Sequence, residues 1–388
     1  MNKTYDLIAT ATFGLEAVVA RELKNLGYTD SLTENARVLF RGDAEAICRC
    51  NLWLRSADRV FIRMGEFQAL SFEELFERTK ALPWDELLPV NAAFPVEGKS
   101  VKSKLFSVPD CQAIVKKAIV EKMKQRYKKQ WFDEDGPKYT IEVGLLNDVA
   151  TLTVDTSGAG LHKRGYRENA GEAPLKETLA AAMVGLSFWN PGRQLMDPLC
   201  GSGTIPIEAA MTGLNMAPGL KRSFASEAWP IIPAELWKRA REEAGAAVRR
   251  DLDFRILASD IDGRVLKTAR RNAELAGVAE YVAFQTLPVS DIRSKKKYGC
   301  IITNPPYGER LGEKKEAEEL YRQMGTVFSE LDAWSFYVLT AHEDFERFFG
   351  RRADRKRKLY NGRLKVDYYQ FYGPKPPKSE DGNESNEG

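Results

Sequence analysis

The stretch LMDPLCGSGTIPIEAA, residues 195–210, decides the fold that this sequence predicts. It reads as a buried strand ending in Asp197, then a turn with Gly201 and Gly203, then a helix. Glycines at such a turn let the backbone approach a ligand, and the helix N-terminus offers free N–H groups to an anion. The turn is not a Walker phosphate loop, because it lacks Gly-Lys-Ser/Thr, and Pro206 replaces the third glycine of a dinucleotide loop.

Acidic residues also close the next two strands. The segment ASDID, residues 258–262, ends a predicted strand with Asp260 and Asp262, and the strand after it leads to Asp291. In doubly wound folds, a carboxylate at the end of the strand that here carries Asp260 and Asp262 binds ribose hydroxyl groups. Acids at successive strand ends on one sheet edge are costly without a partner, so they predict a ligand that donates hydrogen bonds.

Strands alternate with helices from Gly165 onward, which predicts βαβ units and a parallel sheet. A hairpin is expected around Asn361 and Gly362, because both flanking stretches alternate. The expected strands lie at 194–200, 254–262, 281–287, 298–306 and 335–341. This half of the chain is therefore expected to be an α/β domain.

The stretch IITNPPYGERL, residues 301–311, ends one of these strands in an unusual way. Pro305 and Pro306 supply no N–H group and fix their own φ, so nearby carbonyl groups stay available to another partner. The pattern places Asn304 and Tyr307 beside such carbonyls and predicts a binding loop. The structural alternative is that Asn304 caps the turn and Tyr307 packs in the core.

The first 65 residues alternate short strands and helices and predict a ferredoxin-like α+β unit. The expected elements are strands at 5–11 and 37–42 and helices at 14–26 and 43–53. A second unit is expected to about residue 164, with a helix at 71–82, strands near 92–98 and 138–156, and a basic helix at 110–128.

The positive charge is concentrated in two runs although the net charge is only +3. One run spans 99–130, and the other is RRADRKRK at 351–358. In the basic helix, apolar residues at core spacing leave most lysines off the packed face; these lysines include Lys116, Lys117 and Lys124. Each run could be a solvated surface, but together they favour a polyanionic partner.

Composition sets the broad class of the protein. The chain has 388 residues and is 43% hydrophobic, which is enough for two or three cores. No apolar run is long enough for a membrane span and no signal peptide is apparent, so a cytoplasmic protein is expected. The five cysteines are scattered, which fits reduced thiols, and no metal site is expected. The tail at 374–388 is expected to be disordered.

A segment at 214–250 is too long for a plain connection between a helix and a strand. It could act as a lid over a site or pack against a core. Its tryptophans and Leu236 favour packing, since these side chains need burial.

The motifs DPLCGSGT and NPPY resemble class I S-adenosylmethionine-dependent methyltransferases, and APLKETLAAAM before the first motif adds a resemblance to the THUMP-domain RNA methyltransferases. Over nearly the whole chain, the sequence is similar to the THUMP-domain RNA methyltransferases, closest to bacterial enzymes that methylate guanine N2 in 23S ribosomal RNA. The resemblance implies a ferredoxin-like domain at 1–65, an RNA-binding THUMP domain at 66–164 and a Rossmann-like methyltransferase domain with a mixed seven-stranded sheet at 165–373. It also implies ribosomal RNA or a pre-ribosomal particle as the partner.

The resemblance assigns roles to the cofactor loop and the strand-end acids. Asp197 would contact the methionine amino group of S-adenosylmethionine. The turn that follows would hold the methionine end; its residues are Cys200, Gly201, Gly203 and Thr204. Asp260 would bind the ribose, with Asp262 as the alternate, and Asp291 would bind the adenine amino group.

The NPPY motif is typical of enzymes that methylate exocyclic amines. The Asn304 side-chain oxygen, itself beside the cofactor, and the Pro305 carbonyl would accept hydrogen bonds from the amine as its nitrogen rehybridises, while Tyr307 would stack on the base. For RNA contacts the expected residues are Lys116, Lys117, Lys124, Lys163 and Arg164.

Two other functions remain open at this point. A DNA adenine-N6 methyltransferase would use the same amine chemistry, although only about 80 residues follow Tyr307 and leave no room for a sizeable recognition domain. A non-catalytic RNA-binding protein of ribosome assembly could keep the same fold, but the NPPY motif and Asp260 argue against it.

Overall fold

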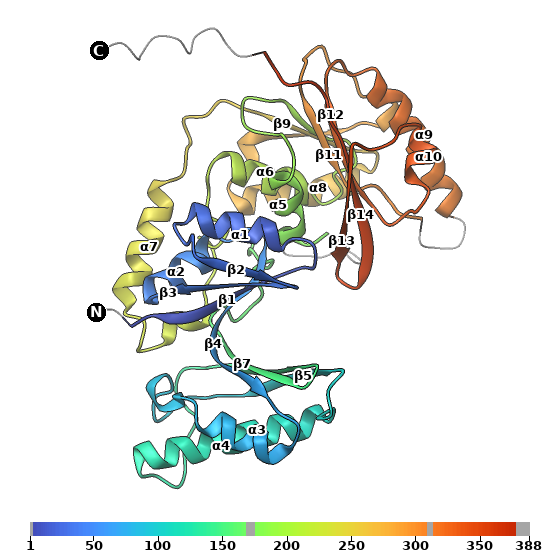
Figure 1. Ribbon diagram of the computed structural model, residues 1–388. Helices are drawn as coiled ribbons and strands as arrows, with labels where there is room; N and C mark the ends of the chain where they lie inside the picture. The colour runs from blue at the N-terminus through green and yellow to red at the C-terminus, as the bar shows by residue number, and fades with distance from the viewer. Residues whose placement is uncertain (1–2, 168–174, 309–312, 378–388) are drawn as a thin grey trace, which may run out of the picture. The chain divides into compact units, whose positions relative to one another are not determined.

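The computed structural model describes residues 3–167, 175–308 and 313–377, which form two compact units. The first unit comprises Met1–Gly165 together with Asn215–Val248, and the second comprises Tyr166–Leu214 together with Arg249–Gly388. Within the described residues each unit is built on one seven-stranded sheet (Figure 1). Of the tail expected to be disordered, residues 378–388 lie outside the described residues.

The sheet of the first unit has the strand order β2-β3-β1-β4-β7-β6-β5. Its strands are β1 (Tyr5–Ala11), β2 (Ser31–Glu34), β3 (Arg37–Gly42), β4 (Ala57–Gln68), β5 (Val96–Val101), β6 (Ile141–Leu146) and β7 (Val149–Asp155). The helices of this unit are α1 (Glu16–Asn25), α2 (Ala44–Trp53), α3 (Phe72–Lys80), α4 (Val108–Tyr127) and α7 (Ala234–Ala246). Side-chain caps from Asp43 and Ser71 begin α2 and α3, as expected for residues with a short acceptor side chain.

Strand β4 joins the two halves of this sheet. Its first part pairs with β1, and its pairing with β7 begins at Phe61 and shifts in register between Arg63 and Gly65. The boundary expected between residues 65 and 66 therefore falls inside a continuous strand. The sequence pattern did not predict β4, because its inward and outward positions change along its length as its neighbours change.

The segment at 215–248 packs within the first unit. Trp229 is 1% exposed, and its ring stacks on Tyr139 with 4.3 Å between ring centroids. Gly219 donates its N–H to the Leu52 carbonyl at 2.9 Å, and a Cβ at Gly219 would lie 2.7 Å from the Leu52 Cα. The segment thus adds α7 against α2 and extends the core of the first unit.

The sheet of the second unit has the strand order β10-β9-β8-β11-β12-β14-β13. Its strands are β8 (Leu195–Asp197), β9 (Ile256–Asp260), β10 (Val282–Thr286), β11 (Cys300–Thr303), β12 (Ser335–Thr340), β13 (Arg355–Asn361) and β14 (Leu364–Phe371). The helices of this unit are α5 (Glu177–Gly185), α6 (Thr204–Gly213), α8 (Gly263–Ala276), α9 (Glu313–Ser329) and α10 (Phe345–Phe349). The strands from β10 to β12 are parallel and the last two are antiparallel. This confirms the predicted mixed seven-stranded sheet.

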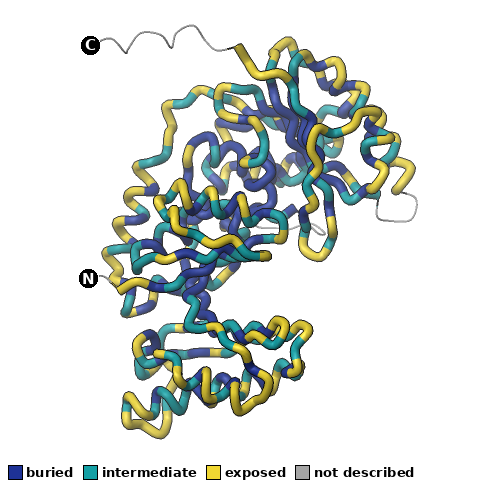
Figure 2. Tube along the Cα trace, viewed as in Figure 1, coloured by how far each residue is buried: buried dark blue, intermediate teal, exposed yellow. Residues whose placement is uncertain are grey.

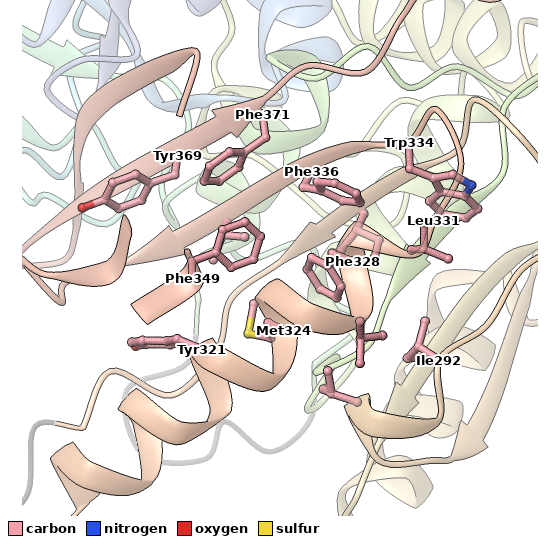
Figure 3. Close-up of a cluster of buried hydrophobic side chains, with 14 of the residues drawn as sticks. Ile292, Tyr321, Met324, Phe328, Leu331, Trp334, Phe336, Phe349, Tyr369 and Phe371 are labelled. Atoms are coloured by element: carbon pink, nitrogen blue, oxygen red, sulfur yellow. The ribbon is translucent and has the colours of Figure 1, made fainter. Parts of the chain in front are cut away.

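Helix α9 buries its apolar face against β12 and β14. Phe328 stacks on Phe336 with 5.2 Å between centroids, and Phe349 from α10 lies 4.8 Å from Phe371 (Figure 3). Tyr321 extends from the same face of α9 into this core and is fully buried. Every residue of the neighbouring strands β11 and β12 is buried (Figure 2). This packing fixes α9 beside the end of β11.

The strand order reverses direction at β8. The two later parallel strands, β11 and β12, lie on one side of β8, and β9 and β10 lie on the other. Ligands of open α/β sheets bind at such a switch point, outside the carboxyl ends of the strands. The ends of β8, β9 and β11 carry Asp197, Asp260 and Asn304, so the topology brings these residues to one edge.

No helix in the described ranges is long and apolar enough to cross a membrane. In the same ranges, no three or more His, Cys, Asp or Glu side chains are grouped so that they could hold a metal ion. The five cysteines lie in the described part of the chain; all are buried and none forms a disulfide.

Candidate active site

The turn between β8 and α6 depends on two glycines for different reasons. Gly201 has φ +51° and Gly203 has φ +86°, a region that L side chains rarely adopt. Space around Gly201 is open, whereas a Cβ at Gly203 would lie 3.1 Å from the Ala269 Cβ on α8. Gly203 therefore also allows α6 and α8 to pack closely, and the turn is held in one shape.

Asp260 is tied to that turn by its carboxylate. One oxygen accepts the Gly201 N–H at 3.0 Å, and the other accepts the Asp262 N–H at 3.0 Å. These two bonds orient the carboxylate at the sheet edge. Asp262 instead caps α8, accepting the Arg264 N–H at 2.8 Å and pairing with the Arg264 guanidinium at 3.0 Å. Asp262, the alternate residue predicted to bind the ribose, therefore already caps the N-terminus of α8.

Asp197 links β8 to the end of β11. It is 1% exposed, and Thr303, the residue before Asn304, donates its hydroxyl to the Asp197 carboxylate at 2.7 Å. Burial raises the pKa of Asp197 to about 7, although the bonds from Thr303 and the Leu199 N–H lower it. A buried carboxylate of this kind gains most from a cationic ligand.

The Asn304–Tyr307 loop is held from both sides. Thr303 anchors its start, and the Tyr321 hydroxyl donates to the Pro306 carbonyl at 2.7 Å and lies 3.0 Å from the Thr340 hydroxyl. Tyr307 donates its own hydroxyl to the Asn304 side-chain oxygen at 2.5 Å. The Asn304 side-chain oxygen, which is predicted to accept a hydrogen bond from the substrate amine, therefore accepts one from Tyr307 in this structure.

Two adjoining cavities surround these groups, with volumes of about 480 and 180 Å³. Both are lined by Leu199, Gly201 and Asn304. The larger also contacts Asp260, Pro305 and Tyr307, and the smaller contacts Asp197, Cys200 and Thr204. The structure thus brings most of the predicted cofactor and catalytic residues together around one shared wall.

Two predicted cofactor residues lie off the cavity walls. Gly203 contributes through packing, as described above. Asp291 is exposed in a short 3-10 helix (Val289–Asp291), and its carboxylate accepts the Ser290 hydroxyl at 2.9 Å. Its role toward an adenine amino group stays a prediction.

Several cavity residues were not predicted. Ile261 lines the larger cavity and is 71% exposed, and Leu287, Pro288 and Val289 line it as well. An apolar residue between two acids in SDID could have indicated Ile261. Gln323 of α9 and Asn361 at the end of β13 also reach the cavity, and no local pattern could have placed them there.

The lysines predicted on α4 are partly engaged within the protein. Lys116 pairs with Glu134 at 2.6 Å and lies 3.7 Å above the Phe94 ring. Lys124 pairs with Glu121 at 2.8 Å. Phosphate would have to compete with these contacts at two of the three positions.

Of the other residues predicted to contact RNA, two are exposed and one is engaged within the protein. Lys117 and Lys163 are exposed. Arg164 is 3% exposed and donates to the carbonyls of Leu161 and Arg55. Its guanidinium stabilises the backbone around it, and its contact with RNA stays a prediction.

Known protein families match three consecutive parts of the chain. The RMKL-like methyltransferase domain matches residues 164–370, the RlmL ferredoxin-like domain matches 6–61, and the THUMP domain matches 69–155. The methyltransferase match contains every residue lining the two cavities.

Full-length relatives share this layout. The chain is 53% identical over 377 residues to YpsC of Bacillus subtilis, described as a candidate RNA methyltransferase, with 97% of this chain and 98% of YpsC covered. A Listeria monocytogenes structure described as a predicted N6-adenine-specific DNA methylase is 52% identical, with a TM-score of 0.92 over 96% of this chain and 97% of that chain. The SMU.472 protein, a candidate methyltransferase solved with S-adenosylhomocysteine (SAH), is 49% identical, with a TM-score of 0.92 over 97% of this chain and 100% of that chain.

Proposed function

This chain belongs to the RMKL-like methyltransferase family, and on that basis we propose that it methylates an exocyclic amino nitrogen of RNA with S-adenosylmethionine. The finer proposal is guanine N2 in 23S ribosomal RNA, either free or in a pre-ribosomal particle. The observation that supports methyl transfer to an amine is the position of Asn304, which lies in the wall shared by both cavities.

The residues present fit S-adenosylmethionine. Buried Asp197 beside the smaller cavity suits the methionine ammonium group, and Asp260 in the larger cavity suits the ribose hydroxyls. Ile261 and Val289 offer apolar surface for the adenine. The related SMU.472 structure contains SAH, the product of the same cofactor. When bound, S-adenosylmethionine supplies a methyl group on a sulfonium that is already a good leaving centre.

The Asn304–Tyr307 loop would act on the amine. The lone pair of an aromatic amine is delocalised into its ring, so the amine is a poor nucleophile. Hydrogen bonds from its N–H groups to the Asn304 side-chain oxygen and the Pro305 carbonyl favour the rehybridised nitrogen, and they require no strong base. The Tyr307 hydroxyl, now on the Asn304 oxygen, would yield its place to the amine, and its ring would stack on the base.

Support for RNA comes from the domain content and a relative. Residues 69–155 match the THUMP domain, for which the family resemblance implies RNA binding. The relative YpsC is described as a candidate RNA methyltransferase. Guanine N2 in 23S ribosomal RNA rests on the sequence resemblance.

Adenine N6 in DNA is the second candidate. The Listeria relative carries that description, and the same loop could act on either amine. The test is to incubate the protein with labelled S-adenosylmethionine and either ribosomal RNA from a strain lacking this gene or DNA free of adenine methylation. Nucleoside analysis should find N2-methylguanosine in the RNA. Label in DNA alone would overturn the proposal.

Changing Tyr321 to Phe is expected to lower the methyl-transfer rate about fivefold without changing cofactor affinity. Burial raises the pKa of Tyr321 to about 12, so the hydroxyl stays protonated and holds the Pro306 carbonyl. Losing one such bond costs about 1 kcal/mol, and it would loosen the loop that presents Asn304. The measurement is kcat together with the dissociation constant of SAH.

Tyr368→Phe is the matched control for that change. Tyr368 is also buried and donates to a backbone carbonyl, that of Met183, at 2.8 Å. Both variants lose one buried hydroxyl, but only Tyr321 contacts the catalytic loop. Equal loss of kcat in the two variants would show a general effect on stability rather than a positioning role.

Cofactor binding is expected to weaken as the pH falls through about 7. The free protein holds Asp197 with its pKa raised to about 7 by burial, and the ammonium of the cofactor needs the ionised carboxylate. The carboxylate is ionised above that pH and neutral below it, so the affinity for SAH should be about tenfold weaker one pH unit below 7 than one unit above. Calorimetry on Asp197→Asn should give weak binding with little pH dependence. A constant affinity of the unaltered protein over this range would contradict the assignment.

A further inference from the structure

An exposed aromatic ring and two lysines occupy the loop between β5 and α4. Phe106 is 81% exposed, and Lys102 and Lys104 beside it are also exposed. Val101 pairs with Leu146 across β5 and β6, and these side chains are 51% and 57% exposed. We refer to these five residues as the loop surface. It lies wholly in the first unit.

The backbone under the loop surface is held in place. The Lys104 N–H donates to the Asp148 carboxylate at 2.6 Å, and the Asp148 N–H donates to the Ser103 hydroxyl at 3.0 Å. The Ser100 hydroxyl donates to the carbonyl of Leu105 at 2.7 Å, and the Leu105 side chain is 6% exposed. Leu105 thus anchors the loop while its two neighbours face solvent. A surface organised in advance loses less entropy on binding.

The charges of the loop surface are available to a ligand. Among the described residues, no carboxylate forms an ion pair with Lys102 or Lys104. Asp148 is the nearest acid in the hydrogen-bond pattern, and its carboxylate accepts a backbone N–H. In contrast, Lys116 and Lys124 on the following helix are paired with Glu134 and Glu121. Both lysines of the loop are therefore unpaired among the described residues, whereas two of the three lysines predicted on α4 are paired.

We propose that the loop surface binds single-stranded RNA, with an unpaired base stacked on Phe106 and phosphates held by Lys102 and Lys104. The proposal rests on the proposed function and names the part of the chain that holds the substrate outside the cavity. Proteins that bind single strands combine aromatic side chains with a basic track along the backbone. Bases inside a duplex are covered by their neighbours, so an exposed ring selects unpaired nucleotides.

A protein partner fits these residues less well. The centres of protein–protein interfaces are depleted in lysine, whereas here two lysines lie just before an aromatic ring that is 81% exposed. The apolar side chains Val101 and Leu146 would give the sugar and base an apolar floor. Charge and aromatic surface thus point to the same ligand.

The test compares Phe106→Ala and a Lys102→Gln/Lys104→Gln double variant with the unaltered protein. Binding of a short unstructured RNA and of an RNA duplex is measured by fluorescence anisotropy at several salt concentrations. Phe106→Ala should weaken single-strand binding about tenfold. The double variant should lower the log–log salt slope by about 1.4, since each phosphate contact on a single strand contributes about 0.7. Duplex binding should change less in Phe106→Ala.

Leu32→Ala and Lys24→Gln are the matched controls. Leu32 is 60% exposed and Lys24 is exposed, both in the same unit but away from the loop surface. Neither change should affect RNA binding. Circular dichroism should be unchanged in every variant, because all of the altered side chains face solvent.

The remaining outcomes overturn the proposal. If the unaltered protein binds RNA and Phe106→Ala binds equally well, the loop surface is not the site. If a triple change of Lys116, Lys117 and Lys124 to Gln lowers the salt slope while the loop variants do not, α4 holds the RNA. If Phe106→Ala changes only the oligomeric state in sedimentation, the loop surface binds a second copy. If the unaltered protein neither binds nor methylates RNA, the proposed function fails as well.

Discussion

Replacing Asn304 with Ala is expected to lower the rate of methyl transfer by a hundredfold or more, because losing one preorganised contact to the transition state costs about 3 kcal/mol. The side-chain oxygen of Asn304 would accept a hydrogen bond from the target amine, and no other side chain in the Asn304–Tyr307 loop carries an amide. Cofactor affinity should remain nearly unchanged, since the amide acts on the amine and not on the sulfonium. Single-turnover kinetics and calorimetry with SAH measure the two effects separately.

Tyr307→Phe is the control for the Asn304 change. It removes the hydrogen bond from the Tyr307 hydroxyl to Asn304 but keeps the ring that would stack on the base. Its rate should stay far closer to that of the unaltered protein than the rate of Asn304→Ala. If both variants lose activity equally, the bond between the two side chains is what matters, and Asn304 would not be the acceptor for the amine.

Replacing Asp260 with Ala is expected to weaken cofactor binding before it changes the rate at saturation. A hydrogen bond to a charged group is worth about 1.5–3 kcal/mol, so the dissociation constant should rise about tenfold to a hundredfold. Part of this loss would come from the Gly201 and Asp262 N–H groups, which now donate to the carboxylate at 3.0 Å. Calorimetry gives the dissociation constant, and kinetics at saturating cofactor gives the rate.

Asp262→Ala separates the ribose contact from a general effect of removing an acid. Asp262 is two residues from Asp260, but its carboxylate caps the N-terminus of α8 and pairs with Arg264. Its loss should lower the unfolding free energy slightly, because α8 loses a helix cap, while cofactor affinity stays near that of the unaltered protein. A larger effect on affinity from Asp262 than from Asp260 would reverse the two assignments.

Much of the candidate site could be predicted because its determinants are local. Gly201 and Gly203 have positive φ values that few other residues tolerate, so their spacing after a strand indicates the turn directly. Acids and Asn304 follow strand ends, and parallel strands bring those ends to one edge. The parallel part of the sheet followed from the alternation of strand and helix patterns, which is also local, whereas the mixed seven-stranded sheet was implied by the family resemblance.

The parts that escaped prediction depend on partners far away in the sequence. Tyr321 meets the Pro306 carbonyl, and Asn361 reaches the larger cavity, only because the core places α9 and the end of β13 there. The packing of 215–248 in the first unit rests on contacts such as the Trp229–Tyr139 stack, which no local pattern encodes.

By itself, the sequence determined the order of elements, the turns and the chemical groups at the strand ends, because these depend on backbone preferences within a few residues. Only the tertiary structure decided which groups are available. Lys116 and Arg164 read as free cations in the sequence, yet one is paired with Glu134 and the other is buried against carbonyl groups. Lys102 and Lys104 lie in the same basic run and remain exposed. A charge is available to a ligand only where folding brings it no partner, and that depends on residues distant in the chain.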